Sequence, residues 1–215
     1  MKSLARSFLA ALAAGLTLLL AAGCGGVGQD GTGAAPPDTL TTGVVNGFGS
    51  VIVGGVRFDV SGAEISVDGA PGRTQSDLRV GMVVEVTGTL SPDGTSGTAT
   101  RVVYESLLRG TIDDLPAVRT VRVLGQSVSI DDTTVFAGAA GADELRAGDR
   151  LQVSGFRSPD GSLKATFVSR ESGPGEPQLT AFITSVAGNI VRLAGLDVSI
   201  ADATLVGVTA PTLTA

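Results

Sequence analysis

Apolar and polar residues alternate with a period of two along much of the chain beyond residue 42, a pattern typical of half-buried β-strands. Val56, Phe58 and Val60 share one face of the clearest of these segments. Arg57 and Asp59 share the opposite face. Abundant valine and threonine, together with 31 glycines, favour many short strands joined by tight turns. The pattern therefore predicts an all-β chain without long helices.

Turn signals divide the first part of this pattern into five strands. Gly54 and Gly55 separate two apolar runs, and only glycine takes the positive φ of a primed hairpin turn without strain. Residues 91–94, SPDG, predict a type I turn with Pro and Asp at its centre. Between these turns, Asp77 is expected to cap a single helical turn that Gly81 ends. The predicted order is three strands, a short helical turn and two further strands.

An internal repeat extends this plan to the second half of the chain. Residues 77–94, DLRVGMVVEVTGTLSPDG, return 67 positions later as ELRAGDRLQVSGFRSPDG, and nine of the 18 positions are identical. In the second copy Arg150 and Gln152 replace Val83 and Glu85, so we expect that face of the strand to meet solvent. The repeat predicts two copies of one small β-domain.

The hairpin pattern begins a third time at residues 190–200, but neither DLRxG nor SPDG follows it. Either the sequence is truncated after Ala215, or the half-repeat packs on its neighbour as an added hairpin. Uncovered strands of this kind would expose a sheet edge that can pair with another chain.

Five short strands with a break between the third and the fourth follow the order of an OB-type barrel. We therefore predict an all-β fold of tandem small five-stranded OB-like antiparallel barrels, with the third repeat incomplete. A repeat of about 60 residues is near the lower limit for a stable single core, so we expect the two barrels to touch. The motifs V-x-V-x-G, D-L-x-x-G, S-P-D-G and A-T-x-V resemble a bacterial domain of unknown function, OB-like and often tandem, in exported lipoproteins. This resemblance implies fold and location, and it carries over no functional residues.

The N-terminus has the composition of a secretory signal peptide. Lys2 and Arg6 precede an apolar run at 8–20, and small residues lead directly to Cys24, which is the single cysteine. The run LLLAAGC resembles the lipobox of bacterial lipoproteins. That resemblance implies that Cys24 is lipidated and becomes the first residue of the mature chain. Several acyl chains would anchor it stably to the membrane, which is the outer one if the host has two.

The expected division of the chain follows from these patterns. Residues 1–23 form the signal peptide, and 24–41 form the lipidated cysteine with a flexible tether rich in Gly and Pro. The first OB-like repeat is expected at 42–106 and the second at 107–171. A linker at 172–179 then leads to the partial third repeat at 180–215.

Composition removes several classes of chemistry. The chain has no histidine, so neither a Ser-His-Asp arrangement nor a zinc site of the usual kind is expected. A net charge of −6 repels phosphate backbones, and Phe58 and Phe167 fall on apolar faces as core residues, so we expect no nucleic-acid partner. Lys164 is the only lysine beyond the leader, and we interpret it as a solvated strand residue.

Carboxylates are the remaining candidates for chemistry. Asp113 with Asp114, and Asp131 with Asp132, form adjacent pairs. Neighbours on a strand point to opposite faces, so we interpret these residues as turn-forming or solvated acids. We expect no catalytic residue, no cofactor and no metal ligand.

The leading functional hypothesis is a membrane-anchored cell-envelope lipoprotein that acts as a non-catalytic binding or interaction module. Its expected partners are the membrane, through the lipid on Cys24, and an envelope protein or a glycan. The alternatives are an oligosaccharide- or cation-binding protein and a carboxylate-based hydrolase.

Overall fold

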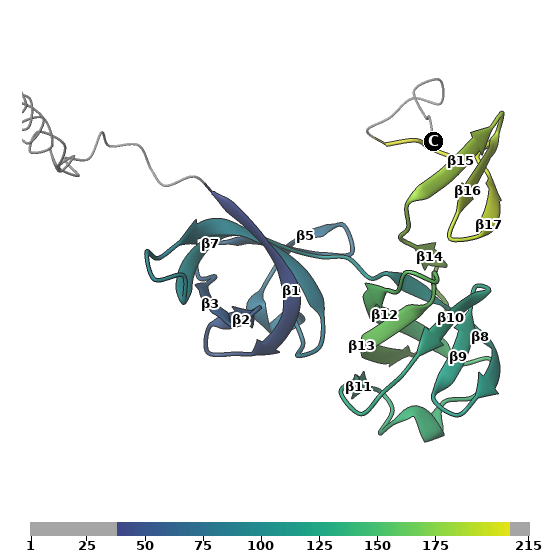
Figure 1. The fold of residues 1–215 in the computed structure, drawn as a ribbon, viewed down its shortest axis with the longest axis horizontal. Helices are drawn as coiled ribbons and strands as arrows, with labels where there is room; N and C mark the ends of the chain where they lie inside the picture. The colour runs from purple at the N-terminus through teal and green to yellow at the C-terminus, as the bar shows by residue number, and fades with distance from the viewer. Residues whose placement is uncertain (1–37, 207–215) are drawn as a thin grey trace, which may run out of the picture. The chain divides into compact units, whose positions relative to one another are not determined.

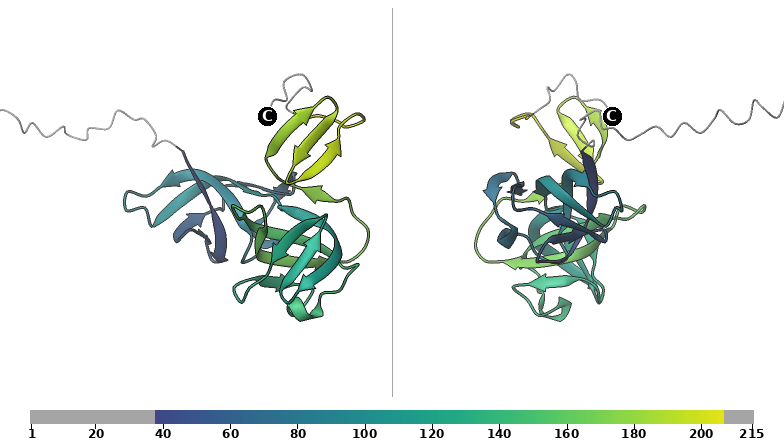
Figure 2. Two further views of the ribbon diagram at one scale, coloured as in Figure 1. Left: turned by 45° about the vertical axis from the view of Figure 1, so that its right-hand side comes forward. Right: turned by 90° about the vertical axis from the view of Figure 1, so that its left-hand side faces the viewer.

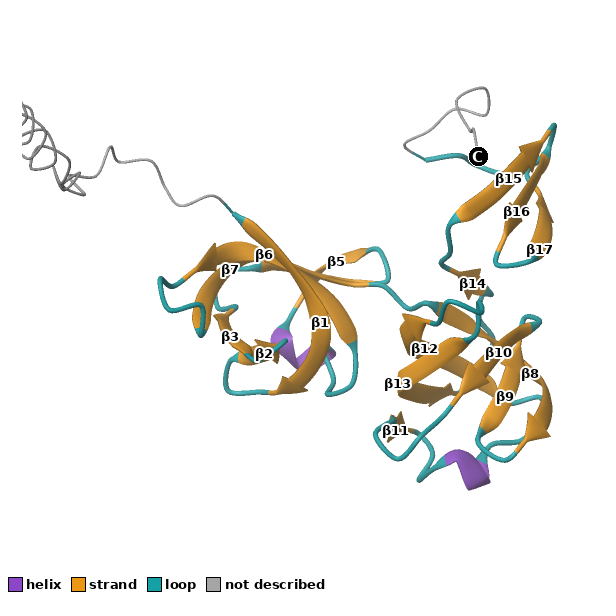
Figure 3. Ribbon diagram, viewed as in Figure 1, coloured by secondary structure: helices purple, strands orange, loops and turns teal. Residues whose placement is uncertain are grey.

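The computed structural model describes residues 38–206. Within that range the chain forms strands and two 3₁₀ turns, which Figure 3 shows in orange and purple. No helix in the described part is long and apolar enough to cross a membrane. Cys24, the predicted signal peptide and most of the predicted tether lie outside the described residues.

The first barrel contains β1 to β7 (Figure 1). The elements are β1 (Thr39–Gly47), β2 (Val51–Val53), β3 (Val56–Asp59), β4 (Glu64–Val67), β5 (Ala70–Arg73), the 3₁₀ turn η1 (Gln75–Asp77), β6 (Val83–Leu90) and β7 (Ser96–Tyr104). Five of the strands close a ring in the order β1-β2-β3-β7-β6. Neighbours are antiparallel except β3 and β7, whose parallel pairing closes the barrel.

The second barrel repeats this plan. Its elements are β8 (Leu108–Ala117), β9 (Thr120–Val123), β10 (Gln126–Ser129), β11 (Val135–Ala137), the 3₁₀ turn η2 (Ala142–Glu144), β12 (Arg150–Arg157) and β13 (Leu163–Glu171). The ring runs β8-β9-β10-β13-β12, and the parallel pair β10–β13 closes it. The predicted tandem five-stranded barrels are thereby confirmed.

The predicted turns form as their residue types require. Gly54 and Gly55 have φ of 59° and 86° between β2 and β3. The amide of Gly94 donates to the carbonyl of Ser91 at 2.9 Å, which closes the SPDG turn. The equivalent tip between β9 and β10 uses Leu124 and Gly125, again with positive φ.

The hairpin β4–β5 was not predicted from the polar stretch that contains it. Asp68 and Gly69 form its turn with φ of 48° and 74°, as a two-residue primed turn requires. β4 then runs parallel to residues 101–104 of β7, beyond the residues 96–98 that pair with β3. The second repeat has only β11 at this place, parallel to β13, without a hairpin partner.

Apolar side chains, most of them aliphatic, fill both barrels, and two buried clusters form the cores. The first consists of Val45, Val51, Val53, Phe58, Val60, Ile65, Leu78, Met82, Val84, Val86, Ala99, Val102, Tyr104 and Phe167. The second consists of Leu108, Ile112, Val121, Val123, Val128, Ile130, Leu145, Leu151, Val153, Leu163, Ala165 and Val168. Phe58 and Phe167 are core residues, as predicted.

The two barrels touch, as their small size led us to expect. Phe167 belongs to β13 of the second barrel, yet it packs in the core cluster of the first. The Thr166 hydroxyl donates to the carbonyl of Gly81 at 2.6 Å, and the amide of Val83 donates to the Ser154 hydroxyl at 2.8 Å. Apolar packing and hydrogen bonds therefore both connect the repeats.

The glycine that ends each V-x-V-x-G motif allows two strands to approach closely. Gly88 and Gly155 each lie at a register shift between the fourth and fifth strands of their ring. A Cβ atom at Gly88 would lie 2.2 Å from the carbonyl oxygen of Thr98. At Gly155 it would lie 2.0 Å from the carbonyl oxygen of Lys164. Any larger residue would therefore push these strands apart.

Two local expectations were wrong. Asp77 is not the residue that begins the helical turn: it is the last residue of η1, and its carboxylate completes a capping box by accepting the amide of Thr74, the N-cap residue, at 2.8 Å. Gly81 does not end that turn, because it lies beyond it with φ of 92°. The face with Arg150 and Gln152 does not meet solvent: Gln152 is 8% exposed and hydrogen-bonded across the junction of the barrels.

A three-stranded antiparallel sheet follows the second barrel. It consists of β15 (Ile183–Ala187), β16 (Ile190–Leu193) and β17 (Leu196–Ser199), drawn in yellow-green in both views of Figure 2. The short strand β14 (Gln178–Leu179) precedes it and pairs with β8, so part of the expected linker is strand. The predicted third hairpin is the pair β16–β17, with Ala194 and Gly195 at its tip.

Candidate functional site

The adjacent aspartates at 113–114 do not converge on one site. Asp113 accepts the amide of Gly125 at 2.8 Å and so supports the hairpin tip. Asp114 forms an exposed ion pair of 3.4 Å with Arg122 on the neighbouring strand. The two carboxylates therefore serve turn and strand contacts, as the sequence interpretation held.

The aspartates at 131–132 are also engaged separately. Asp131 accepts the Thr133 hydroxyl at 2.6 Å and pairs with Lys164 at 3.0 Å. The Thr133 hydroxyl, followed by Lys164, holds the pKa of Asp131 well below its usual range. Asp132 pairs with Arg119 at 2.6 Å. Lys164 is thus a surface strand residue with a carboxylate partner, and no group of three or more possible metal-binding side chains occurs within residues 38–206.

Hydrogen bonds within the two SPDG turns lower the pKa values of the aspartates in them, Asp93 and Asp160. Asp93 accepts the hydroxyl of Ser91 at 2.5 Å, and the amide of Thr95 at 3.0 Å. The Ser91 hydrogen bond and then those of Thr95 lower the pKa of Asp93 to about 2. In the second repeat, Ser162 lowers the pKa of Asp160 in the same way, with its hydroxyl ahead of its amide. These acids are fixed as charged turn residues.

We expect the protein to lose stability in acid because of the SPDG turn at residues 91–94. Because the folded-state pKa of Asp93 lies near 2 and its ordinary value is 3.8, its contribution is present above pH 3.8 and is lost as pH falls through about 2. Unfolding free energies at pH 5 and pH 2 should show a larger loss for the wild type than for Asp93→Asn. Ser91→Ala, which removes the first donor, should be intermediate. Equal losses in all three proteins would contradict the prediction.

A buried polar network joins the barrels at Asp68, whose side chain is 10% exposed. Its Oδ1 accepts the amide and the hydroxyl of Ser106 at 2.7 and 2.8 Å. Its Oδ2 accepts Nη2 of Arg109 at 2.6 Å and Nε2 of Gln152 at 2.7 Å. One carboxylate of the first repeat therefore takes four donors from the interrepeat connection and the second repeat.

The network continues through Glu171 to the segment before β14. Glu171 pairs with Nε of Arg109 at 3.2 Å and with Nε of Arg150 at 3.0 Å. Arg150 also donates to the carbonyl oxygens of Gly175 and Glu176 at 2.5 and 2.7 Å. The guanidinium of Arg150 therefore fixes the predicted linker against the second barrel.

Tyr104 lies in the core beside this network. Burial raises the pKa of its hydroxyl far above the usual range, and the charge of Asp68 adds to the effect. The Ser154 hydroxyl, which accepts the amide of Val83, lowers this pKa and so acts in the opposite direction. The Tyr104 hydroxyl is buried and has no hydrogen-bond partner among the described residues. It is therefore a core residue that carries an unsatisfied polar atom.

Removing that hydroxyl should not harm the protein. We expect Tyr104→Phe to leave the unfolding free energy unchanged or to raise it by about 1 kcal/mol, since a buried unpaired hydroxyl is unfavourable. Tyr104→Ala, which leaves a cavity, should cost about 3–5 kcal/mol. Denaturant titration measures both. A loss above about 1 kcal/mol for Tyr104→Phe would show that the hydroxyl is bonded after all.

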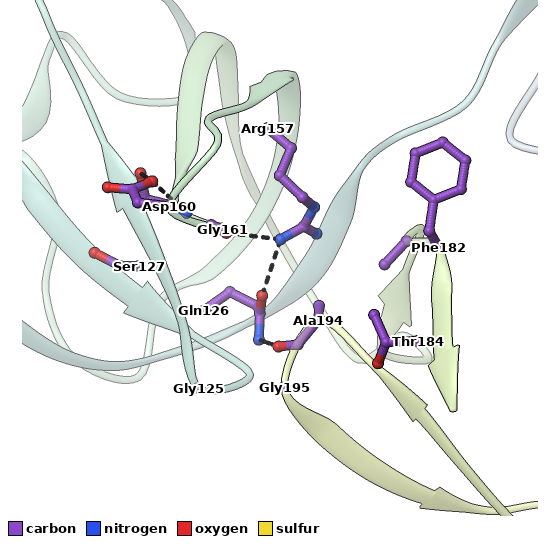
Figure 4. Close-up of a pocket in the computed structure, with 12 residues that line it drawn as sticks. Gly125, Gln126, Ser127, Arg157, Asp160, Gly161, Phe182, Thr184, Ala194 and Gly195 are labelled. Atoms are coloured by element: carbon purple, nitrogen blue, oxygen red, sulfur yellow. Dashed lines mark hydrogen bonds between the residues drawn. The ribbon is translucent and has the colours of Figure 1, made fainter. Parts of the chain in front are cut away.

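A hollow with a volume of about 680 Å³ lies between the second barrel and the third sheet (Figure 4). Two hairpin tips and the β12–β13 turn line it, together with the segment that leads into β15. The lining residues are Gly125, Gln126, Ser127, Arg157, Asp160, Gly161, Ser162, Ala181, Phe182, Thr184, Ala194 and Gly195. Its volume is in the range of small-molecule sites.

Arg157 is the central polar group of this pocket, as Figure 4 shows. Its Nη1 donates to Oε1 of Gln126 at 3.2 Å and to the carbonyl of Gly161 at 2.8 Å. Gln126 in turn donates to the carbonyl of Ala194 at 3.0 Å. Phe182 is 90% exposed at the rim. The pocket therefore combines a fixed cation, amide and hydroxyl groups, and one aromatic face.

Sequence reasoning missed both the network and the pocket. Asp68 stood in a polar stretch, and its Asp-Gly dipeptide was the one local signal for the turn that presents it. Arg109 and Phe182 belong to no motif, and Arg157 stands in the repeat where the first copy has Leu90. The fold brings all three to their partners from distant positions. The lipidation site, Cys24, lies outside the described residues and stays a prediction.

The fold and its contacts define a class of protein: tandem closed five-stranded barrels with filled interiors, joined by a polar network. The chain matches the family described as "Domain of unknown function (DUF5666)" over residues 41–103 and 109–169, which fall in the two closed barrels. These matches cover more than half of the chain, so it belongs to this family. No curated protein and no solved structure gave a match. The resemblance to a tandem domain of unknown function is thereby confirmed.

Proposed function

We propose that this chain is a lipid-anchored cell-envelope protein of bacteria whose tandem barrels act as a non-catalytic interaction module. The lipobox-like sequence at Cys24 supports the anchor, and the Gly/Pro-rich segment after it supports a tether. The acidic surface supports protein or neutral partners over phosphate-rich ones.

One observation carries the interaction role: the groups that could perform chemistry are already used to hold the fold. Asp131 and Lys164 pair with each other, Asp93 and Asp160 hold turns, and Asp68 joins the barrels. Aliphatic side chains fill the barrel interiors, which leaves the outer surfaces for contact with partners.

The anchor is tested by replacing the cysteine. Cys24→Ala should abolish incorporation of labelled palmitate and release the protein from the membrane fraction. Val27→Ala, a matched change just beyond the cysteine, should leave labelling and fractionation unaltered. A Cys24→Ala protein that stays labelled and membrane-bound would overturn the anchoring proposal.

The interaction role is tested with the full chain purified in detergent. Crosslinking to envelope extract should yield a saturable complex with an envelope protein. Turnover of an envelope glycan or ester substrate that is lost in Asp131→Asn or Asp113→Asn would overturn the non-catalytic role in favour of a carboxylate-based hydrolase.

Oligosaccharide binding is the second candidate, and the pocket at Arg157 favours it. A sugar ring has an apolar face that can lie on Phe182, and its hydroxyls can bond to Gln126 and Arg157. Glycan-array binding that is lost in Phe182→Ala but kept in Phe156→Ala, an exposed phenylalanine elsewhere, would establish this role. Binding that survives Phe182→Ala would exclude the pocket as a glycan site.

A further inference from the structure

A further pocket, which we call the junction pocket, lies where the outer face of the first barrel meets β12 of the second, with a volume of about 320 Å³. Strand pairing forms its floor, because Thr42 of β1 and Val103 of β7 lie on either side of Glu85 of β6. The alternate residues Val84 and Val102 belong to the core of the barrel. Since successive side chains of a strand point to opposite faces, the floor faces outward, where a ligand can reach it.

Contacts that join the two barrels hold the walls of the junction pocket. The hydroxyl of Ser154 on β12 accepts the amide of Val83 at 2.8 Å, which fixes one wall against the floor. Thr180 stands on another side, where its amide donates to the carbonyl of Leu107 at 2.9 Å and its hydroxyl to the carbonyl of Ser106 at 3.1 Å. The pocket is therefore formed without a ligand.

The lining of the junction pocket is mainly apolar. It consists largely of the aliphatic side chains of Val83, Val103 and Leu107 and the ring of Phe156, which is 46% exposed. Concave apolar surfaces with few polar groups are characteristic of small-molecule sites, and the volume is at the lower end of their range. The lining thus favours a small ligand with an apolar part.

Two carboxylates without a cationic partner lie at this pocket. Glu85 and Glu105 both belong to its lining, which contains no arginine or lysine. Neither forms an ion pair within residues 38–206. Oε1 of Glu105 accepts the amide of Gly69 at 3.0 Å, a neutral donor that leaves the negative charge uncompensated. The charge of the pocket therefore favours a cation.

The second repeat shows which cation such a carboxylate binds. Glu105 and Glu171 are equivalent, since each is the glutamate of an A-T-x-V-x-x-E-S sequence at the end of the fifth strand. Glu171 pairs with Nε of Arg150 at 3.0 Å. The first repeat has Val83 where the second has Arg150, and Val83 lines the junction pocket. The first repeat therefore has a pocket where the second supplies its own guanidinium group.

We propose that the junction pocket binds a small organic cation of the alkylguanidinium type, a guanidinium group on a short apolar chain. The guanidinium group donates charge-assisted hydrogen bonds to Glu85 and Glu105. The chain packs on Leu107 and Phe156. This site is distinct from the pocket at Arg157, and it adds a small-molecule ligand to the proposed interaction role.

Butylguanidinium is the probe that tests the site. It is titrated calorimetrically into the full chain in a neutral detergent, with the detergent alone as the blank, and saturable binding is expected. Two related compounds separate the contributions of charge and chain. Guanidinium ion lacks the chain and butyrate has the opposite charge, so each should bind more weakly than the probe by about tenfold or more.

Variants of the lining assign the binding to this pocket. Glu85→Gln and Glu105→Gln keep the side-chain size and remove the charge, so each should weaken binding by about tenfold or more. Phe156→Ala should weaken it by about threefold or more. Glu64→Gln, at an exposed glutamate of β4 outside the pocket, should bind like the wild type. Both lining glutamates are exposed, so circular dichroism should show an unchanged fold.

The outcomes separate this site from the proposed function. Absence of saturable binding, or binding that both glutamine variants leave unchanged, would overturn it. Guanidinium ion that binds as tightly as the probe would also overturn it, because the apolar lining would then contribute nothing. None of these results affects the envelope complex, which is measured by crosslinking without the probe.

Discussion

Gly155→Ala is expected to unfold the second barrel or to cost it at least about 3 kcal/mol, at the upper end of single-residue effects. The new Cβ would lie 2.0 Å from the carbonyl oxygen of Lys164, and 3.0 Å from the Cα of Ala165. Both are backbone atoms of the paired strand, so neither can turn aside as a side chain would. Relief requires β12 and β13 to separate at their register shift. Urea denaturation followed by circular dichroism measures the loss.

Gly141→Ala is the matched control in the same repeat. Gly141 has an extended backbone with φ of 177°, and a Cβ there meets no atom within 4 Å. The free energy of unfolding of the Gly141→Ala variant should differ from that of the wild type by less than about 0.5 kcal/mol. If Gly155→Ala were as mild as this control, the close approach of the two strands would be refuted.

Asp68→Ala is the second change with a large expected effect, a loss of about 3–5 kcal/mol. It removes the acceptor of four hydrogen bonds, and it leaves the mostly buried Arg109 guanidinium with Glu171, at 3.2 Å, as its remaining acidic partner. The positive φ of Asp68 adds to the loss, since alanine adopts that region less readily than aspartate. Chemical denaturation should show the loss, and limited proteolysis should cleave the connection between the barrels more quickly.

Asp114→Ala provides the comparison with an ordinary ion pair. Asp114 and Arg122 are 3.4 Å apart, and about half of each side chain is exposed. An exposed pair contributes at most about 1 kcal/mol, so this variant should stay close to the wild type. Similar losses for the two aspartates would show that the junction network is no stronger than a surface contact.

The barrels could be predicted from the sequence because their signals are local and occur twice. Period-two alternation marked β3, and Gly54-Gly55 and the SPDG sequences marked turns. The sequence contains the V-x-V-x-G motif, but it does not explain why the motif ends in glycine. Gly88 and Gly155 must be glycine because a Cβ atom at either position would clash with a carbonyl oxygen of the paired strand. The positions of those carbonyl groups follow only from the register of the strand pairing.

The polar network at Asp68 could not be predicted from the sequence, because its contacts also depend on how distant strands are arranged. Arg150 and Gln152 replaced Val83 and Glu85 at equivalent positions, and polar residues on one strand face suggested solvent. In the structure Gln152 instead meets Asp68, 84 positions earlier in the chain. Alternation indicates which residues share a face, but not what lies against that face.

The position of Phe167 has a consequence for cooperativity. This side chain comes from the last strand of the second barrel, yet it completes the core of the first. The first barrel therefore cannot reach its full packing until the second has folded around β13. The repeats are two units by sequence, but we expect them to unfold as one. Loss of order in β13 opens both barrels, so the two should melt together in a single transition.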